Sequence, residues 1–197
     1  LVGSEMCIRD RTPMIPRVGL RMQLSEILND LTYYGRGPEE NYRDRRTSQF
    51  IGEYTTPIKD LYEPYIRPQE NEHRTDIYWC ALTTKQKAGL LFIADRTFEL
   101  NASNYLLGSL DSGETIDNGA PRTNETNHRH LTDPQPVKQV DMFIDYRMMG
   151  VGGDNSWGAI AHEPYLIRPG VENAIEYGFS IVPFDKKADY KNLIYQY

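Results

Sequence analysis

The stretch TDIYWCALTTKQKAGLLFIADRTF (residues 75–98) decides the fold that we expect for this chain. Residues 75–83 and 88–98 are rich in aromatic, aliphatic and β-branched side chains, and the polar residues 84–87 separate them. Two such segments joined by a short polar turn are typical of a β-hairpin. Trp79 matches no ligand motif, so we expect it to lie in the core or on the sheet surface. Cys80 lies in an apolar run and is expected to be a buried small hydrophobic residue.

Further short strands are predicted on both sides of this hairpin. Residues 16–24 (PRVGLRMQL) alternate apolar and polar side chains, the pattern of a half-buried strand. Residues 101–110 are expected to form one or two helical turns. The other expected strands are 31–34, 48–55, 140–148 and 177–183. Several short strands with turn signals and little helix predict an all-β fold, an antiparallel β-sandwich.

Composition excludes two classes of partner. The chain of 197 residues has a formal net charge of −6, and its basic residues alternate with acidic ones. Binding to nucleic acid needs a concentrated basic face, so no nucleic-acid partner is expected. No apolar run approaches the roughly 20 residues that span a bilayer, so no membrane partner is expected.

The first eleven residues, LVGSEMCIRDR, join abruptly to a well-patterned strand. Residues 5–11 can be back-translated into a string that looks like the end of a transposase-type sequencing adapter. We therefore interpret residues 1–11 as an artefact and expect native sequence from Thr12. The expected organisation is one β-sandwich domain over residues 12–184, present in part, followed by a C-terminal tail over residues 185–197.

Three segments carry a family resemblance: YGRGPEENYRDR (34–45), LYEPYIRPQEN (61–71) and MGVGGDNSW (149–157). In this order and spacing they resemble the small-chain, or fifth, domain of the large bacterial β-galactosidases of glycoside hydrolase family 2. The resemblance runs from about Pro16 to Phe184. It implies a galactose-mutarotase-like supersandwich, of which this chain holds the C-terminal portion.

The sequence departs from the family pattern at three places. Glu72 stands where the family usually has glycine, which puts a tight turn in doubt. Asn155 replaces an aspartate, a nearly isosteric change that we expect to preserve the loop. Residues 108–127 look like an insertion.

The segment 149–157 is the expected functional site. The resemblance implies that Trp157 is the platform on which the aglycone sugar, the glucose of lactose, stacks. Glycines allow unusual backbone angles and close approach of the chain, and Asp and Ser side chains can bind nearby N–H groups. The residues expected to support the platform are Gly150, Gly152, Gly153, Asp154, Asn155 and Ser156.

The resemblance implies that the full-length protein hydrolyses terminal β-D-galactosides by a retaining mechanism. Its two catalytic glutamates would lie outside this chain, and the isolated fragment is expected to be inactive. No cofactor is expected within the chain, whereas the full enzyme would use magnesium and a monovalent cation, sodium. The expected partners are a galactoside substrate, the remaining domains of the same polypeptide and, in a homo-oligomer, further copies. A cytoplasmic location is the first expectation, and a periplasmic one stays open.

Other polar residues are expected to be structural. Glu40 and Asp44 have the residue type of a glycosidase pair, but their charged loop favours Arg–carboxylate pairing. Ties to neighbouring domains are the favoured role of Tyr65, Glu70, Asn71 and Arg74, with bonds to sugar hydroxyls as the alternative. His128 and His130 have no third metal ligand nearby and are expected to be exposed or satisfied.

Two other functions stay open. A non-catalytic carbohydrate-binding module predicts that the isolated chain binds sugar. A sugar epimerase of the mutarotase-like class needs a histidine and a glutamate facing one sugar ring, and the sequence offers no evident pair.

Overall fold

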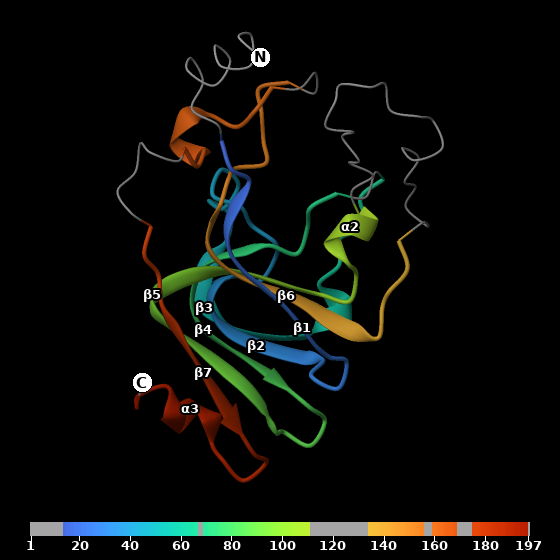
Figure 1. The fold of residues 1–197 in the computed structure, drawn as a ribbon, viewed down its shortest axis with the longest axis vertical. Helices are drawn as coiled ribbons and strands as arrows, with labels where there is room; N and C mark the ends of the chain where they lie inside the picture. The colour runs from blue at the N-terminus through green and yellow to red at the C-terminus, as the bar shows by residue number, and fades with distance from the viewer. Residues whose placement is uncertain (1–13, 67–68, 111–133, 156–158, 169–174, 197) are drawn as a thin grey trace, which may run out of the picture.

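A computed structural model describes residues 14–66, 69–110, 134–155, 159–168 and 175–196. The strands pair antiparallel in one seven-stranded sheet, which confirms the predicted all-β class and is consistent with a β-sandwich (Figure 1). The strands are β1 (Arg17–Ser25), β2 (Asp30–Gly37), β3 (Phe50–Pro57), β4 (Arg74–Thr83), β5 (Gly89–Ser103), β6 (Gln139–Met148) and β7 (Phe179–Phe184). The short helices are η1 (Ile58–Asp60), α2 (Leu107–Leu110), η2 (Glu163–Tyr165) and α3 (Tyr190–Leu193).

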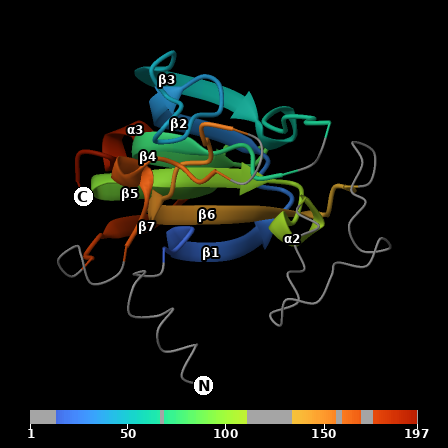
Figure 2. The ribbon, with the colours of Figure 1, turned by 90° about the horizontal axis from the view of Figure 1, so that it is seen from above.

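Strand β5 extends further than the sequence predicted. It continues to Ser103, so the helix expected over 101–110 is limited to Leu107–Leu110. The order across the sheet is β1-β6-β5-β4-β2-β3, which Figure 2 shows from above. One edge of β5 lies along β4, and the other serves two strands in turn, since residues 89–94 pair with β7 and residues 99–103 pair with β6.

One face of the sheet carries the main hydrophobic core. Every second residue of the central strands contributes to it, as a pleated strand requires. Burying these apolar side chains is the main stabilising term of the fold. Fully buried members include Leu31, Tyr33, Ile77, Phe92, Leu100, Met142 and Ile144. Cys80 belongs to this core, as predicted.

The opposite face divides into an apolar half and a polar half. At the apolar half Trp79, Leu91 and Val182 form a second cluster, against which α3 packs through Tyr190 and Leu193. The C-terminal tail therefore docks on the sheet, beside β7 (Figure 1). Among the described residues no helix is long and apolar enough to cross a membrane.

The polar half is covered by the segment that leads into β4. Glu72 in this segment has a φ of 64°, in the left-handed region that favours glycine. Glu72 thus adopts a backbone conformation that the family's usual glycine would adopt with less strain. The Glu72 side chain is buried, with the residue 2% exposed, and its Oε1 has no hydrogen-bond partner in the described part. Burial raises the pKa of Glu72 from its ordinary 4.5 to about 8, although Ser103 and Arg74 oppose the shift.

We predict that Glu72→Gln makes the stability of the chain less dependent on pH. The folded-state pKa of Glu72 lies above the unfolded-state pKa, so the unfolded chain loses its proton first as pH rises. The free energy of unfolding of the parent should therefore fall between about pH 4.5 and 8, by an amount on the order of a few kcal/mol. Denaturant unfolding at pH 5 and pH 8 measures this difference. The glutamine variant should gain stability over the parent at pH 8, whereas the exposed Glu26→Gln should behave like the parent. Parallel pH profiles for parent and Glu72→Gln would contradict the prediction.

Candidate functional site

The glycine-rich loop follows β6 and lies where several segments converge. The structure describes Gly150, Gly152, Gly153, Asp154 and Asn155, whereas Ser156 and Trp157 lie outside the described residues. Backbone bonds tie the start of the loop down: the Met149 N–H donates to Pro16 O and the Gly150 N–H to Tyr165 O, both at 2.8 Å. The start of the loop is thus bound both to Pro16, just before β1, and to Tyr165 of η2.

Asp44 joins the first family segment to this loop. Its Oδ2 accepts the Gly152 N–H at 2.7 Å, and its Oδ1 accepts the Val151 N–H at 3.2 Å. Both oxygens of one carboxylate therefore bind consecutive backbone amides of the loop. Hydrogen bonds to a charged acceptor are stronger than neutral ones, which suits a clamp on a loop without regular structure. The sequence predicted that carboxylates of this charged turn pair with arginines. Asp44 instead binds backbone amides of the glycine-rich loop.

The glycines are needed for close approach. None of Gly150, Gly152 and Gly153 has a φ in the left-handed region, so the expected unusual backbone angles are not the reason for them. A Cβ on Gly150 would lie 2.6 Å from Asp44 Oδ2, and one on Gly153 would lie 2.2 Å from Ala159 O. A Cβ on Gly152 would be 3.2 Å from Asp44 Oδ2, which is tight but less severe. The clamp and the segment after residue 158 both require a chain without side chains here.

Asp154 has a different partner from the one expected. Its Oδ1 lies 2.7 Å from His162 Nε2, and both side chains are largely exposed. The pair links the two sides of the loop, while Asp44 binds the backbone amides. His162 has no motif that would have marked it in the sequence.

Glu40 has several structural partners. Its Oε1 accepts hydrogen bonds from Arg45 and from the Tyr65 hydroxyl, and its Oε2 accepts the Glu72 N–H at 2.9 Å. The expected Arg–carboxylate pairing of this turn is confirmed, because Arg46 also binds both oxygens of Asp76 at 3.0 Å. Glu40 and Asp44 are thus both occupied with structural partners.

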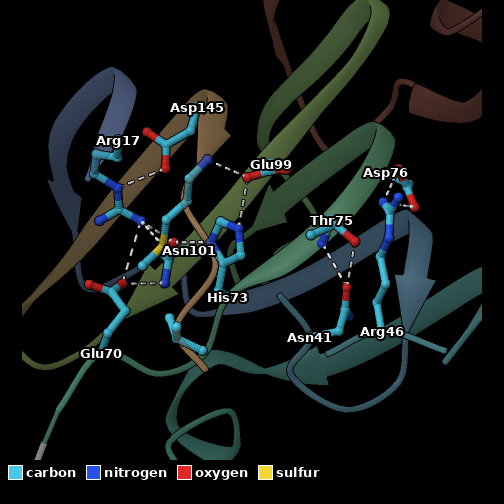
Figure 3. A network of polar contacts seen from close by, with 12 residues as sticks. Arg17, Asn41, Arg46, Glu70, His73, Thr75, Asp76, Glu99, Asn101 and Asp145 are labelled. Carbon is cyan, nitrogen blue, oxygen red and sulfur yellow. Dashed lines mark hydrogen bonds and ion pairs between the residues drawn. The ribbon is translucent and has the colours of Figure 1, made fainter. Parts of the chain in front are cut away.

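The second family segment and the residues that follow it make hydrogen bonds to other parts of the same chain. The Asn41 N–H donates to His73 O at 2.7 Å, and Asn41 Oδ1 accepts from the Thr75 N–H and hydroxyl (Figure 3). Arg74 is buried and donates to Tyr33 and to the carbonyls of Glu72 and Pro38. Glu70 accepts from Arg17 and Asn101, and one donor of Asn71 is used by carbonyls of its own segment. These partners favour the structural role over sugar contacts.

A buried polar layer lies under this segment, and the sequence did not reveal it. His73 is fully buried, with Nδ1 2.7 Å from Asn101 Oδ1 and Nε2 3.1 Å from Glu99 Oε2 (Figure 3). Burial alone would lower the pKa of His73, but the hydrogen bond and charge of Glu99 outweigh it and raise that pKa. Glu99 Oε2 also accepts the Met148 N–H at 2.6 Å. The histidine–glutamate pair that the epimerase alternative needed therefore exists, but the buried His73 cannot face a sugar.

Asp145 completes the layer. Its Oδ2 lies 3.0 Å from Arg17 Nε, an ion pair whose geometry is too bent for a hydrogen bond, so both carboxylate oxygens lack a hydrogen-bond donor in the described part. Burial raises the pKa of Asp145 to about 6, with Arg17 opposing the shift. Alternating polar residues on β5 and β6 were the only sequence signal for this layer. In the described ranges no group of three or more His, Cys, Asp or Glu side chains could hold a metal ion. His128 and His130 lie outside those ranges.

We predict that Asp44→Asn loosens the loop without unfolding the chain. The amide group of asparagine would place an N–H₂ against one of the two backbone donors, and the loss of one charged hydrogen bond at this partly exposed site should cost about 1 kcal/mol. Hydrogen exchange at Val151 and Gly152 should accelerate about fivefold. Asp60→Asn, which changes an exposed aspartate without a partner in the described part, serves as the control. Unchanged exchange at both amides would show that Asp44 is no clamp.

We also predict that Gly150→Ala is more damaging than Gly152→Ala. The added Cβ at position 150 meets the Asp44 carboxylate 0.6 Å closer than the one at position 152, at 2.6 Å against 3.2 Å. Overpacking of this kind typically costs about 1–3 kcal/mol. Thermal unfolding of the two variants measures the difference. Equal melting temperatures for the two variants would contradict the prediction that contact with the Asp44 carboxylate decides the damage.

Comparison with known proteins agrees with the three segments. Residues 3–181 match the family described as beta galactosidase small chain. A beta-galactosidase of Priestia megaterium is 34% identical over 166 residues, which cover 84% of this chain and 15% of that protein. A beta-galactosidase of Vibrio cholerae is 31% identical over 84% of this chain and 14% of its own length. A beta-galactosidase of Leuconostoc mesenteroides is 31% identical over 79% of this chain and 13% of its own length. The chain thus spans 13–15% of the length of these relatives, and it belongs to the beta-galactosidase small-chain family.

Proposed function

We propose that this chain is part of a β-galactosidase that releases terminal, non-reducing β-D-galactose from lactose-type substrates with retention of configuration. The names of the relatives support this activity, and the matched segments support the role of this part. Retaining hydrolysis needs two carboxyl groups about 5–5.5 Å apart, one as acid/base and one as nucleophile. Glu40 and Asp44 are bound to structural partners, so we assign both catalytic glutamates to a part of the protein outside this chain.

The contribution of this chain is the aglycone side of the active site, through Trp157. The observation that carries this proposal is the Asp44 clamp, which brings the first family segment to the loop that leads to the tryptophan. An indole face stacks on the apolar C–H face of a pyranose, and aromatic side chains contribute most when they are held rigid. The loop is held by the two hydrogen bonds from its backbone amides to Asp44, by the bond to the Tyr165 carbonyl and by its close approach to Ala159. Such a loop is suited to hold a platform.

The remaining partners are assigned by the same proposal. Magnesium and a sodium ion would be bound by other parts of the full enzyme, where they would supply charge stabilisation near the reacting sugar. The other domains of the same polypeptide and further copies in a homo-oligomer would contact this domain. We place the enzyme in the cytoplasm, with the periplasm as the alternative.

The test is Trp157→Ala in the full-length enzyme. Loss of the platform should weaken glucose and lactose binding about tenfold, equivalent to about 1.4 kcal/mol, since a sugar in the aglycone position loses its stacking partner. Inhibition by galactose should change little, because galactose occupies the other side of the scissile bond. Inhibition constants for glucose and galactose measure the two effects. Equal losses for both sugars would refute the platform role.

Two controls sharpen the test. Trp157→Phe keeps an aromatic face and should recover part of the affinity for glucose. The isolated chain should release no chromophore from a chromogenic galactoside, because the catalytic pair is assigned elsewhere. Any hydrolysis by the isolated chain would contradict the assignment of the catalytic pair to another part of the protein, whether or not Glu40→Gln and Asp44→Asn abolish it.

A further inference from the structure

A polar groove lies at the point where β5 changes partner. Its volume is about 760 Å³, and residues 95–99 of β5 form its floor. It is flanked by residues 146–147, near the end of β6, and by residues 176–178, which lead into β7. The turn that contains Arg43 and Arg46 closes one side. Because β7 stops pairing at Ala94 and β6 begins at Glu99, the intervening β5 residues have no strand along this edge. We call this feature the β5 groove.

The volume suits a small ligand. Sites for small molecules and cofactors have volumes of about 300–1,000 Å³, and they use a few well-placed polar groups to fix orientation. The β5 groove also borders the glycine-rich loop through the turn 42–46, since Asp44 of that turn binds the loop. It nevertheless involves no residue of the loop itself.

Charges with no partner face the β5 groove in equal numbers. Arg43, Arg96, Asp95 and Glu176 line it and make no side-chain hydrogen bond or ion pair in the described part of the chain. With the other charged lining residues, Arg46, Arg147, Asp76 and Glu99, the groove has four positive and four negative groups, so its formal charges balance and favour neither an anion nor a cation. Planar guanidinium and carboxylate groups each bind two neighbouring hydroxyls well, as donor and acceptor respectively.

Glu99 supplies an oriented acceptor on the floor. The residue is 7% exposed, and its Oε2 is held by His73 and by the Met148 N–H. Its Oε1 makes no hydrogen bond and is not among the atoms buried from solvent in the described residues. One oxygen of this carboxylate is therefore fixed inside the protein while the other remains available to a ligand in the groove. A positioned acceptor of this kind binds a hydroxyl with little loss of side-chain entropy.

Aromatic rings complete the lining. Tyr146 and Tyr177 both contribute, with ring centroids 6.1 Å apart. The Tyr177 hydroxyl donates to Ile144 O at 3.1 Å, which fixes its ring. Aromatic faces combined with paired donors and acceptors match a ligand that has apolar C–H faces and many hydroxyls.

We propose that the β5 groove is a binding site for neutral saccharides, separate from the Trp157 platform. Glu99 and Glu176 accept hydrogen bonds from sugar hydroxyls, Arg96 donates to them, and Tyr146 packs against the ring face. The site requires neither the hydrolase activity nor Trp157, so this proposal does not depend on the proposed function.

The test is titration of the full chain with lactose, with cellobiose as a second neutral probe and digalacturonic acid as an anionic one. Lactose should bind with a dissociation constant on the order of 1 mM, and the anion no more tightly. Backbone amide shifts should report lactose at Arg96, Thr97 and Glu176. Absence of binding by both neutral sugars at concentrations far above this range would overturn the proposal, and so would a clear preference for the anion.

Variants locate the site. Arg96→Gln and Glu176→Gln change exposed side chains without structural partners, so folding should be retained, and each should weaken lactose binding about tenfold. The distant, exposed Lys186→Ala should leave the affinity unchanged. Lactose binding that is lost in Trp157→Ala but kept in Arg96→Gln and Glu176→Gln would place the sugar on the platform and refute the groove. The full-length glucose inhibition assay tests the platform separately, so the two failures are distinguishable.

Discussion

The constraint on which this structure depends is that one long strand serves two neighbours along a single edge. β5 has 15 residues, and β7 and β6 pair with its first and last parts. Pairing with β7 ends at Ala94 and pairing with β6 begins at Glu99, so the edge is interrupted between these two residues. The interruption leaves space for the β5 groove, and the two halves of β5 face different surroundings. The first half packs on the apolar cluster under α3, and the second half carries the buried polar layer.

The family segments form one connected structure, although they are far apart in the sequence. Residues 70–75 bind the turn 38–46 through Asn41 and Glu40, and the same turn binds residues 151–152 through Asp44. Each of these links has a backbone N–H as donor, and the acceptor is a side-chain oxygen except for the His73 carbonyl, which accepts from Asn41. Such bonds fix position along the chain as well as distance. The three segments are therefore best understood as one support for the loop rather than as three separate sites.

The sequence predicted the strands well because their signals are local. Alternation marked β1, and the apolar runs around a polar turn marked the β4–β5 hairpin, which the structure contains with small shifts of the ends. The end of β5 was missed because Asn101 and Ser103 alternate with apolar residues in a way that also fits a helical turn. The clamp on Val151 and Gly152 could not be found locally, because 107 residues separate Asp44 from Val151. The His73–Glu99 pair was missed for the same reason, since only the register of β4 and β5 brings it together.

The buried polar layer explains how the support can be specific. Burying His73, Glu99 and Asp145, with the partly buried Arg17, carries a desolvation cost that pairing offsets only in part. An apolar layer of the same volume would often be as stable or more so. An apolar layer would, however, allow the covering segment to shift, because hydrophobic contacts have little directionality. Asn101 donates to Asn71 O at 2.8 Å and accepts from Arg17 at 2.7 Å, so it fixes the covering segment in one position. That position sets where the His73 carbonyl meets Asn41, and Asn41 belongs to the turn that carries Asp44. The geometry of the glycine-rich loop thus depends on buried charges on the far side of that turn, through directional bonds at every step.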